Sequence, residues 1–83
     1  MVYVVTYDLN ATGQDYKTLI KYLESEFAVR ILKSVWLLKS NKTANSIFHE
    51  LHALMDANDN IWISEVNSNR QGFIPPSGWA YLR

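Results

Sequence analysis

The sequence contains no cysteine, which excludes disulfide bonds and metal sites built on thiolates. It also has no basic segment followed by a signal-like apolar run, and no apolar run of the length that spans a membrane. We therefore expect a cytoplasmic protein with no membrane partner. In such a protein the glycosylation sequons that begin at Asn10 and Asn41 have no role.

Net charge is absent as well, because eight basic residues balance eight acidic ones. The chain therefore lacks the strongly basic footprint of many nucleic-acid-binding proteins. The charges are nevertheless segregated along the sequence. Residues 29–42 contain no acid and hold the bases Arg30, Lys33, Lys39 and Lys42, which form either a local basic strip or a set of ordinary solvated side chains.

Large apolar side chains are abundant for a chain of 83 residues, which has three Trp, five Tyr and three Phe. A chain of this length has room for one core, so residues 1–83 should form a single domain. A body this small leaves more apolar surface than it can cover by itself. The composition therefore favours a homodimer.

The start of the chain predicts a central β-strand. Residues 2–7 favour extended structure and run directly into the carboxylate of Asp8. Neither face of this strand is polar enough to be a solvent-exposed face. Alternation places Val2, Val4, Thr6 and Asp8 on one face, and Tyr3, Val5 and Tyr7 on the other.

Two helices and further strands follow from the apolar periodicity. Thr12 and Asp15 resemble a capping pair for a helix with the stripe Tyr16, Leu19, Ile20, Leu23 and Phe27. Residues 29–39 should be extended, as one strand or two. Thr43 should cap a second helix, whose stripe is Ile47, Phe48, Leu51, Leu54 and Met55. Residues 56–60 have turn chemistry, and residues 61–66 should form the last clear strand.

This order predicts an α+β fold, the ferredoxin-like βαββαβ sandwich, with two helices on one face of an antiparallel sheet. The other face would be bare, and we expect it to be covered in a homodimer. Residues 67–83 should be a loop-rich tail that is able to cross to the neighbouring subunit, with residues 79–82 as a candidate edge strand.

Two features are candidates for chemistry. His49 and His52 are neighbours on the second predicted helix, but His49 points away from its apolar stripe and His52 lies on the flank of the stripe, so both are better explained as surface residues. Asp8 ends a strand, where it either starts a turn or holds a metal ion. One carboxylate is too few for a hydrolytic magnesium site, but a two-fold axis through the bare face would bring two copies of Asp8 together.

Three short segments together resemble a known family. They are Tyr7-Asp8-Leu9 at the end of the first strand, residues 30–36 after the first helix, and residues 56–63 before the last strand. In their order and spacing they are similar to the CRISPR-associated protein 2 family and its stand-alone SinR-like relatives. The similarity covers roughly residues 2 to 66.

The resemblance implies a homodimeric protein that is either a metal-dependent ribonuclease or deoxyribonuclease, or a scaffold that holds DNA. The family's first-strand acid corresponds to Asp8, which would bind Mg²⁺ or Mn²⁺, and its basic residue before the second strand corresponds to Arg30. Residues implied for nucleic-acid binding are Tyr7, Arg30, Lys33, Ser34 and Trp36. One departure is residues 13–17, which hold a single lysine beside an acid where the family often has arginines, and this weakens a role in CRISPR adaptation.

Our hypothesis is that paired Asp8 side chains hold the metal ion and that Arg30 offsets the negative charge that develops on the phosphate. Tyr7 and Trp36 would stack on a base or fill the core, and the core role is favoured for aromatic residues in so small a domain. Ser34 lacks a histidine base and is better explained as a strand residue than as a nucleophile.

The rival hypothesis is a catalytically silent module that binds nucleic acid or protein, in which Asp8 only ends a strand. An RNA-recognition sheet is disfavoured because its glycine and aromatic signature is missing, and an amino-acid-sensing domain of the same topology stays open.

Overall fold

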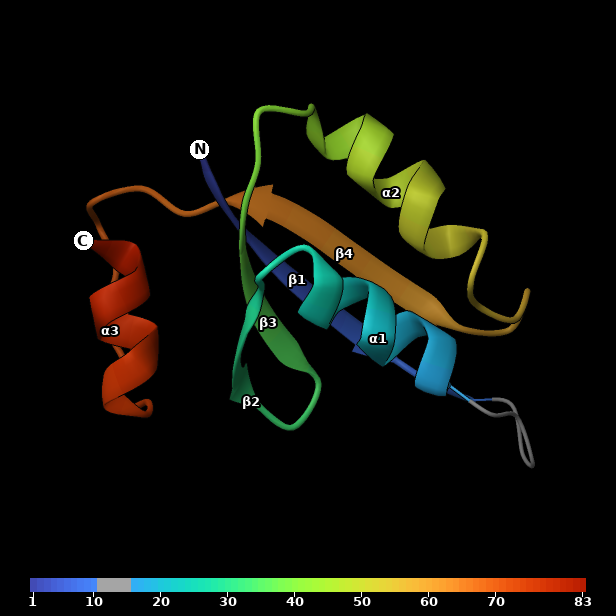
Figure 1. Cartoon of the computed structure of the whole chain (residues 1–83), viewed down its shortest axis with the longest axis horizontal. Coiled ribbons are helices and arrows are strands. Elements are labelled where there is room, and N and C mark those ends of the chain that lie inside the picture. Colours follow the sequence, from blue (N-terminus) through green and yellow to red (C-terminus); the bar gives the residue numbers. More distant parts are fainter. Residues whose placement is uncertain (11–15) are drawn as a thin grey trace.

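The computed structural model describes residues 1–10 and 16–83, which form one antiparallel sheet and three helices (Figure 1). The sheet has four strands in the order β2-β3-β1-β4, as expected for a ferredoxin-like α+β fold. The elements in chain order are β1 (Val2–Asp8), α1 (Lys17–Ser25), β2 (Val29–Leu32), β3 (Val35–Lys39), α2 (Ala44–His52), β4 (Asn60–Glu65) and α3 (Pro76–Leu82).

The first strand has the two faces that the alternation predicted, and it lies in the middle of the sheet between β3 and β4. Tyr3, Val5 and Tyr7 are buried in the core that α1 and α2 cover. The side chains between them point to the second face of the sheet. The strand ends at Asp8, which is exposed.

Helix α1 buries the predicted stripe, since Leu19 and Leu23 have no exposed surface. The proposed capping pair, Thr12 and Asp15, lies outside the described residues. The prediction that Phe27 belongs to the buried stripe is wrong, because its side chain is 82% exposed. The helix ends before this residue: Phe27 has a φ of 58°, and the N–H groups of Phe27 and Ala28 donate to the carbonyls of Glu24 and Leu23. This is a Schellman ending with phenylalanine where glycine is usual, and it turns the ring out of the core.

Helix α2 begins as predicted, because the Thr43 hydroxyl accepts the backbone N–H of Ser46 at 3.1 Å. Ile47 and Leu51 are buried against the sheet.

The extended segment between the helices forms the two strands β2 and β3, and a bulge lies between Arg30 and Leu32. The bulge matters for the site because it decides which face of the sheet Arg30 occupies.

The C-terminal tail differs from the prediction. Residues 76–82 form a helix and not an edge strand, and α3 packs beside β2 of its own chain, at the left of the view in Figure 1. Pro76 stands in the first turn of the helix, where its missing N–H has no cost. Gly78 lets the helix approach closely, because a Cβ there would be 2.7 Å from carbons of Ile31 and Ile74.

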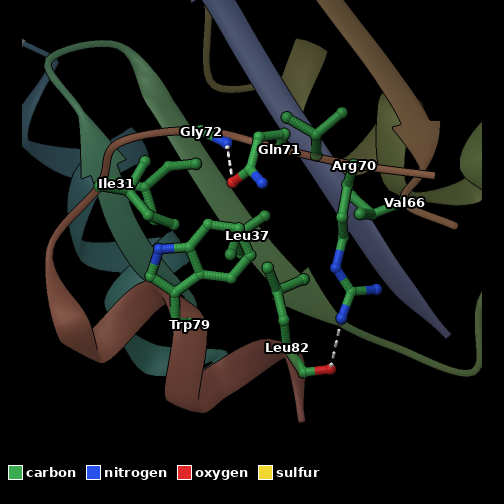
Figure 2. A pocket seen from close by; sticks show the side chains of 10 residues that line it. Ile31, Leu37, Val66, Arg70, Gln71, Gly72, Trp79 and Leu82 are labelled. Atoms are coloured by element: carbon green, nitrogen blue, oxygen red, sulfur yellow. Dashed lines mark hydrogen bonds between the residues drawn. The ribbon is translucent and has the colours of Figure 1, made fainter. Parts of the chain in front are cut away.

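The tail covers part of the sheet face that the sequence analysis left bare (Figure 2). Trp79 and Leu82 lie over Val4 and Leu37 around an apolar cavity of about 150 Å³, and Leu37 is only 2% exposed. Within the described residues, few polar contacts hold helix α3 in place. The Arg70 guanidinium donates to the Leu82 carbonyl at 3.4 Å, and the Lys39 N–H donates to the Tyr81 hydroxyl at 2.9 Å. None of the described helices is both long and apolar enough to cross a bilayer.

Candidate functional site

Asp8 lies at the end of the central strand, on the sheet face opposite α1 and α2. Its register partner is Asn60, the first residue of β4, and the neighbouring pair on this face is Thr6 with Trp62. These side chains line a shallow hollow of about 320 Å³ that opens to solvent. The hollow therefore combines an exposed carboxylate, an amide and an exposed indole ring.

A buried carboxylate fixes this end of the sheet. Asp59, which the sequence analysis treated only as part of a turn, is 6% exposed and joins three segments. Its Oδ1 accepts the Asn10 N–H at 2.7 Å and the Tyr16 hydroxyl at 2.8 Å, and its Oδ2 accepts the Asp56 N–H at 2.8 Å. Through Asn10, the loop after Asp8 is bound to the loop before Asn60. The sequence signal for this role was an acid directly before a strand in an Asn- and Asp-rich turn.

Tyr7, Arg30 and Trp36 form a second cluster on the helix-bearing side of the sheet. The Trp36 indole N–H donates to the Tyr7 hydroxyl at 3.0 Å, and the Arg30 guanidinium lies 5.2 Å from the Trp36 ring centroid. Arg30 also reaches the Tyr7 hydroxyl at 3.5 Å. The rings of Tyr7 and Trp36 are buried, so in this structure they fill the core and present no free face to a base.

The structure therefore does not bring Arg30 to Asp8 within one chain. Arg30 pairs with Trp36 across the ladder, whereas Asp8 points to the opposite face. The alternation of side chains along a strand enforces this separation, because Tyr7 and Asp8 are consecutive residues. The expectation that Arg30 faces the phosphate held at Asp8 has no support in the geometry of a single chain.

Lys33 and Ser34 lie in the turn between β2 and β3, close to the end of β1. The Ser34 carbonyl accepts the Tyr7 N–H at 3.2 Å, and the Lys33 carbonyl accepts the Arg30 Nε–H at 3.0 Å. The Lys33 side chain is exposed. Of the residues predicted to bind nucleic acid, Lys33 is thus an exposed cation near the Asp8 end of the sheet, and Ser34 contributes a backbone contact there.

Among the described residues, Asp8 is the one carboxylate of each chain that a metal ion could use at this site. Within residues 1–10 and 16–83, no three His, Asp or Glu side chains are grouped as metal ligands. Mg²⁺ is often held by one or two carboxylates with water and substrate phosphate, so Asp8 fits such a site if a second copy or a substrate completes it. His49 and His52 do not contribute, since both rings pack against Phe48 on the outer side of α2, at centroid distances of 5.2 and 5.0 Å.

A third cluster joins the two helices of the core. The Tyr22 hydroxyl of α1 donates a hydrogen bond to the Glu50 carboxylate of α2, and the Lys42 ammonium lies 2.7 Å from the same carboxylate. The hydrogen bond from Lys42, followed by that from Tyr22, lowers the pKa of Glu50. Burial, followed by the neighbouring Glu50, raises the pKa of Tyr22. The cluster ties α1 to α2 and to the loop that precedes α2, and we assign it a role in stability.

These features define a small α+β protein whose central strand ends in an exposed acid on an open sheet face. The sequence model of the family described as CRISPR associated protein Cas2 matches residues 1–72, and the chain belongs to this family. The family resemblance predicted from the three short segments is therefore confirmed. Helix α3 lies beyond the matched residues.

One solved structure with the same fold is a hypothetical protein TT1823 from Thermus thermophilus. The two chains are 22% identical, with a TM-score of 0.65, and the alignment covers 89% of this chain and 93% of that one. At this identity the likeness shows the fold alone. No curated protein matches the sequence.

Proposed function

We propose that the protein acts as a homodimer that binds RNA or DNA and hydrolyses its phosphodiester bonds, with Mg²⁺ or Mn²⁺ held by Asp8. The observation that carries the proposal is the position of Asp8. It is an exposed acid at the end of the central strand of a Cas2 family protein, in a hollow beside Asn60 and Trp62. Two-fold pairing of this face would supply the second carboxylate.

Exposed apolar side chains support pairing through the part of the sheet that α3 leaves open. Leu32 is 53% exposed, and it belongs to the same row of the sheet as Val35, Thr6 and Trp62. A row of this kind crosses all four strands and is costly to leave in water. The dimer of this proposal therefore uses the Asp8 end of the face, and not the end that α3 occupies.

The roles of the residues follow from their positions. Asp8 is the catalytic residue because, of the residues that the structure describes, it alone presents a carboxylate in the hollow, and it would hold the metal ion there. A bound Mg²⁺ or Mn²⁺ supplies charge to a phosphate oxygen and acidifies a water ligand. Lys33 attracts the phosphate backbone from the adjacent turn. Arg30 is a positioning residue that fixes Tyr7, and through it the strand that carries Asp8.

The proposal is tested by nuclease assays on wild type and Asp8→Asn. Single-stranded RNA and duplex DNA are incubated with Mg²⁺, with Mn²⁺ and with chelator. We expect cleavage that needs the metal and falls at least about a hundredfold in Asp8→Asn, in the range that removal of one charge-stabilising group costs. Glu24→Gln is the matched control, because Glu24 is an exposed acid on α1, away from this face. Equal cleavage by Asp8→Asn and wild type would refute the paired-acid mechanism, and so would a monomeric mass in light scattering.

The second candidate is a catalytically silent module of the same fold that holds nucleic acid or protein. The orientation of Arg30 favours it, because the guanidinium that would stabilise a transition state packs on Trp36 instead. This candidate predicts binding of RNA or DNA without cleavage under every metal condition. The same set of assays separates the two functions.

A further inference from the structure

Helix α3 and a second copy of the chain need the same face of the sheet. Val4 and Leu37 are register partners on β1 and β3, and both line the cavity beneath α3. The next pair on this face of the same two strands is Thr6 with Val35, which belongs to the row that the proposed dimer covers. The two pairs are two residues apart along each strand, which is about 7 Å. The helix therefore stands directly beside the proposed contact.

The docked helix limits how widely two sheets can stack. An α-helix with its side chains is about 10–12 Å across, whereas two stacked sheets pack about 10 Å apart. A docked α3 thus fills the space in which a second sheet would lie over Val4 and Leu37. The open end of the face covers four strands and about three residues of each, roughly 200 Å² in projection. A stable pair buries about 800 Å² per partner, so pairing at this end alone is in the range of weak, transient contacts.

The attachment of α3 to the sheet is weak. Among the residues that the structure describes, one hydrogen bond joins residues 67–83 to the rest of the chain, from the Lys39 N–H to the Tyr81 hydroxyl. The Lys39 ammonium also lies 4.7 Å from the centroid of the Tyr81 ring. The apolar cavity of about 150 Å³ beneath the helix leaves its lining side chains without contacts on one side. The Phe73 ring, in the loop that leads to α3, is fully exposed and anchors nothing.

Release of α3 would leave the core intact. The buried core cluster and the partly buried residues packed against it extend from Tyr3 to Ile63, and within the described part of the chain none of them lies in the tail. The family model ends at residue 72, before the helix begins. The core is therefore complete without α3, and the place of the helix on the sheet is available to another occupant.

We propose that α3 is an autoinhibitory segment: docked on its own sheet, it confines pairing to the Asp8 end of the face, and its release lets a second copy of the chain cover the whole face. The inference rests on the dimer of the proposed function and adds its regulation. Tight pairing is open only to chains with α3 released, which lowers the apparent affinity in proportion to their fraction. Because the proposed site needs two copies of Asp8, docking of α3 also suppresses cleavage.

The test locks α3 on the sheet by a disulfide in the variant Ile31→Cys/Gly78→Cys. A Cβ at Gly78 lies 2.7 Å from the Ile31 Cγ2, which is one bond from the Ile31 Cβ, so the two Cβ atoms are about 4 Å apart or less, as a disulfide requires. The chain has no cysteine of its own, so no other disulfide forms within it. Sedimentation over a concentration series gives the dissociation constant of the dimer for the oxidised and the reduced form of this variant.

We expect the oxidised form to pair at least about tenfold more weakly than the reduced form, and dithiothreitol to restore pairing. Gly78→Leu cannot seat α3 against Ile31 and should pair at least about tenfold more tightly than wild type, as for a helix docked in roughly nine tenths or more of the free chains. Ser77→Leu, on the exposed side of α3, is the matched control and should pair like wild type.

The outcomes separate this inference from the proposed function. Equal dissociation constants for the oxidised and reduced forms would overturn the autoinhibition and leave the nuclease proposal in place. Oxidation that links two chains, instead of closing a ring within one, would also overturn it, because α3 would then belong on the sheet of the other copy. Tighter pairing by Gly78→Leu, with no metal-dependent cleavage by any variant, would refute the nuclease and support the role of α3. A monomeric mass for every variant at all concentrations would refute both.

Discussion

Replacement of Asp59 by asparagine tests whether one buried carboxylate holds the Asp8 end of the sheet together. The carboxylate accepts two backbone N–H groups, from Asn10 and Asp56, and the hydroxyl of Tyr16. In Asp59→Asn one acceptor oxygen becomes an NH₂ group, so at least one of these donors faces another donor. A hydrogen bond to a charged group contributes about 1.5–3 kcal/mol, and we expect the free energy of unfolding to fall by about 2–3 kcal/mol.

The assay is urea unfolding followed by circular dichroism at one protein concentration, because dimerisation makes apparent stability concentration-dependent. For a domain of this size the loss corresponds to a fall in Tm of about 10–20 °C. Asp56→Asn is the control, since among the described residues its carboxylate accepts only the N–H of Asn58, within an exposed turn, and it should cost less than about 1 kcal/mol. A change below about 0.5 kcal/mol in Asp59→Asn, or equal costs for the two variants, would refute the reasoning.

Three other regions give predictions. Phe27→Gly should raise the free energy of unfolding by about 1 kcal/mol, because the left-handed φ of 58° strains any residue but glycine and the ring is exposed. Phe27→Ala retains this strain. An increase in the free energy of unfolding in Phe27→Ala as large as that in Phe27→Gly would contradict this account. Gly78→Leu should detach α3, seen as a red shift and greater iodide quenching of Trp79 emission while the core stays folded, whereas the exposed Ser77→Leu should change neither. Glu50→Gln should destabilise the protein more at pH 7 than at pH 3 in urea titrations. A lowered carboxyl pKa stabilises the fold above the unfolded pKa, and this contribution is lost as the pH falls through the folded pKa. An equal difference at both pH values would count against the Lys42–Glu50–Tyr22 cluster.

The elements with a strong local period were predictable from the sequence, and those that depend on distant contacts were not. The strand β1, the buried residues of α1 (Leu19 and Leu23) and of α2 (Ile47 and Leu51), and the Thr43 cap all follow from residues within one or two turns of each other. Helix α3 has only seven residues, too few to be stable alone, and it depends on the fit of Gly78 against Ile31. Phe27 was misplaced for a related reason, because the helix ends without the glycine that usually marks the end.

The candidate site shows the same division. The face of Asp8 followed from counting residues along one strand. The position of Arg30 could not be obtained in this way, because the bulge after it changes the alternation along β2. The role of Asp59 was also hidden, since two of its donors, Asn10 and Tyr16, are 49 and 43 residues away in the sequence.

Among the described residues, each hollow holds a single carboxylate, and this places a strict demand on the proposed catalysis: the site must be assembled from two chains. Wild-type and Asp8→Asn subunits, mixed in equal amounts and allowed to exchange, would form about one quarter wild-type dimers, one half mixed dimers and one quarter variant dimers, as for random pairing in a two-fold assembly. If both carboxylates hold the metal ion, only the wild-type dimers cleave, and activity should fall to about a quarter of that of the unmixed protein at the same total concentration. Glu24→Gln subunits, treated in the same way, should leave activity unchanged. Activity of about one half after full exchange would show that each chain works with its own Asp8, and the shared site would then be wrong even if the protein is a nuclease.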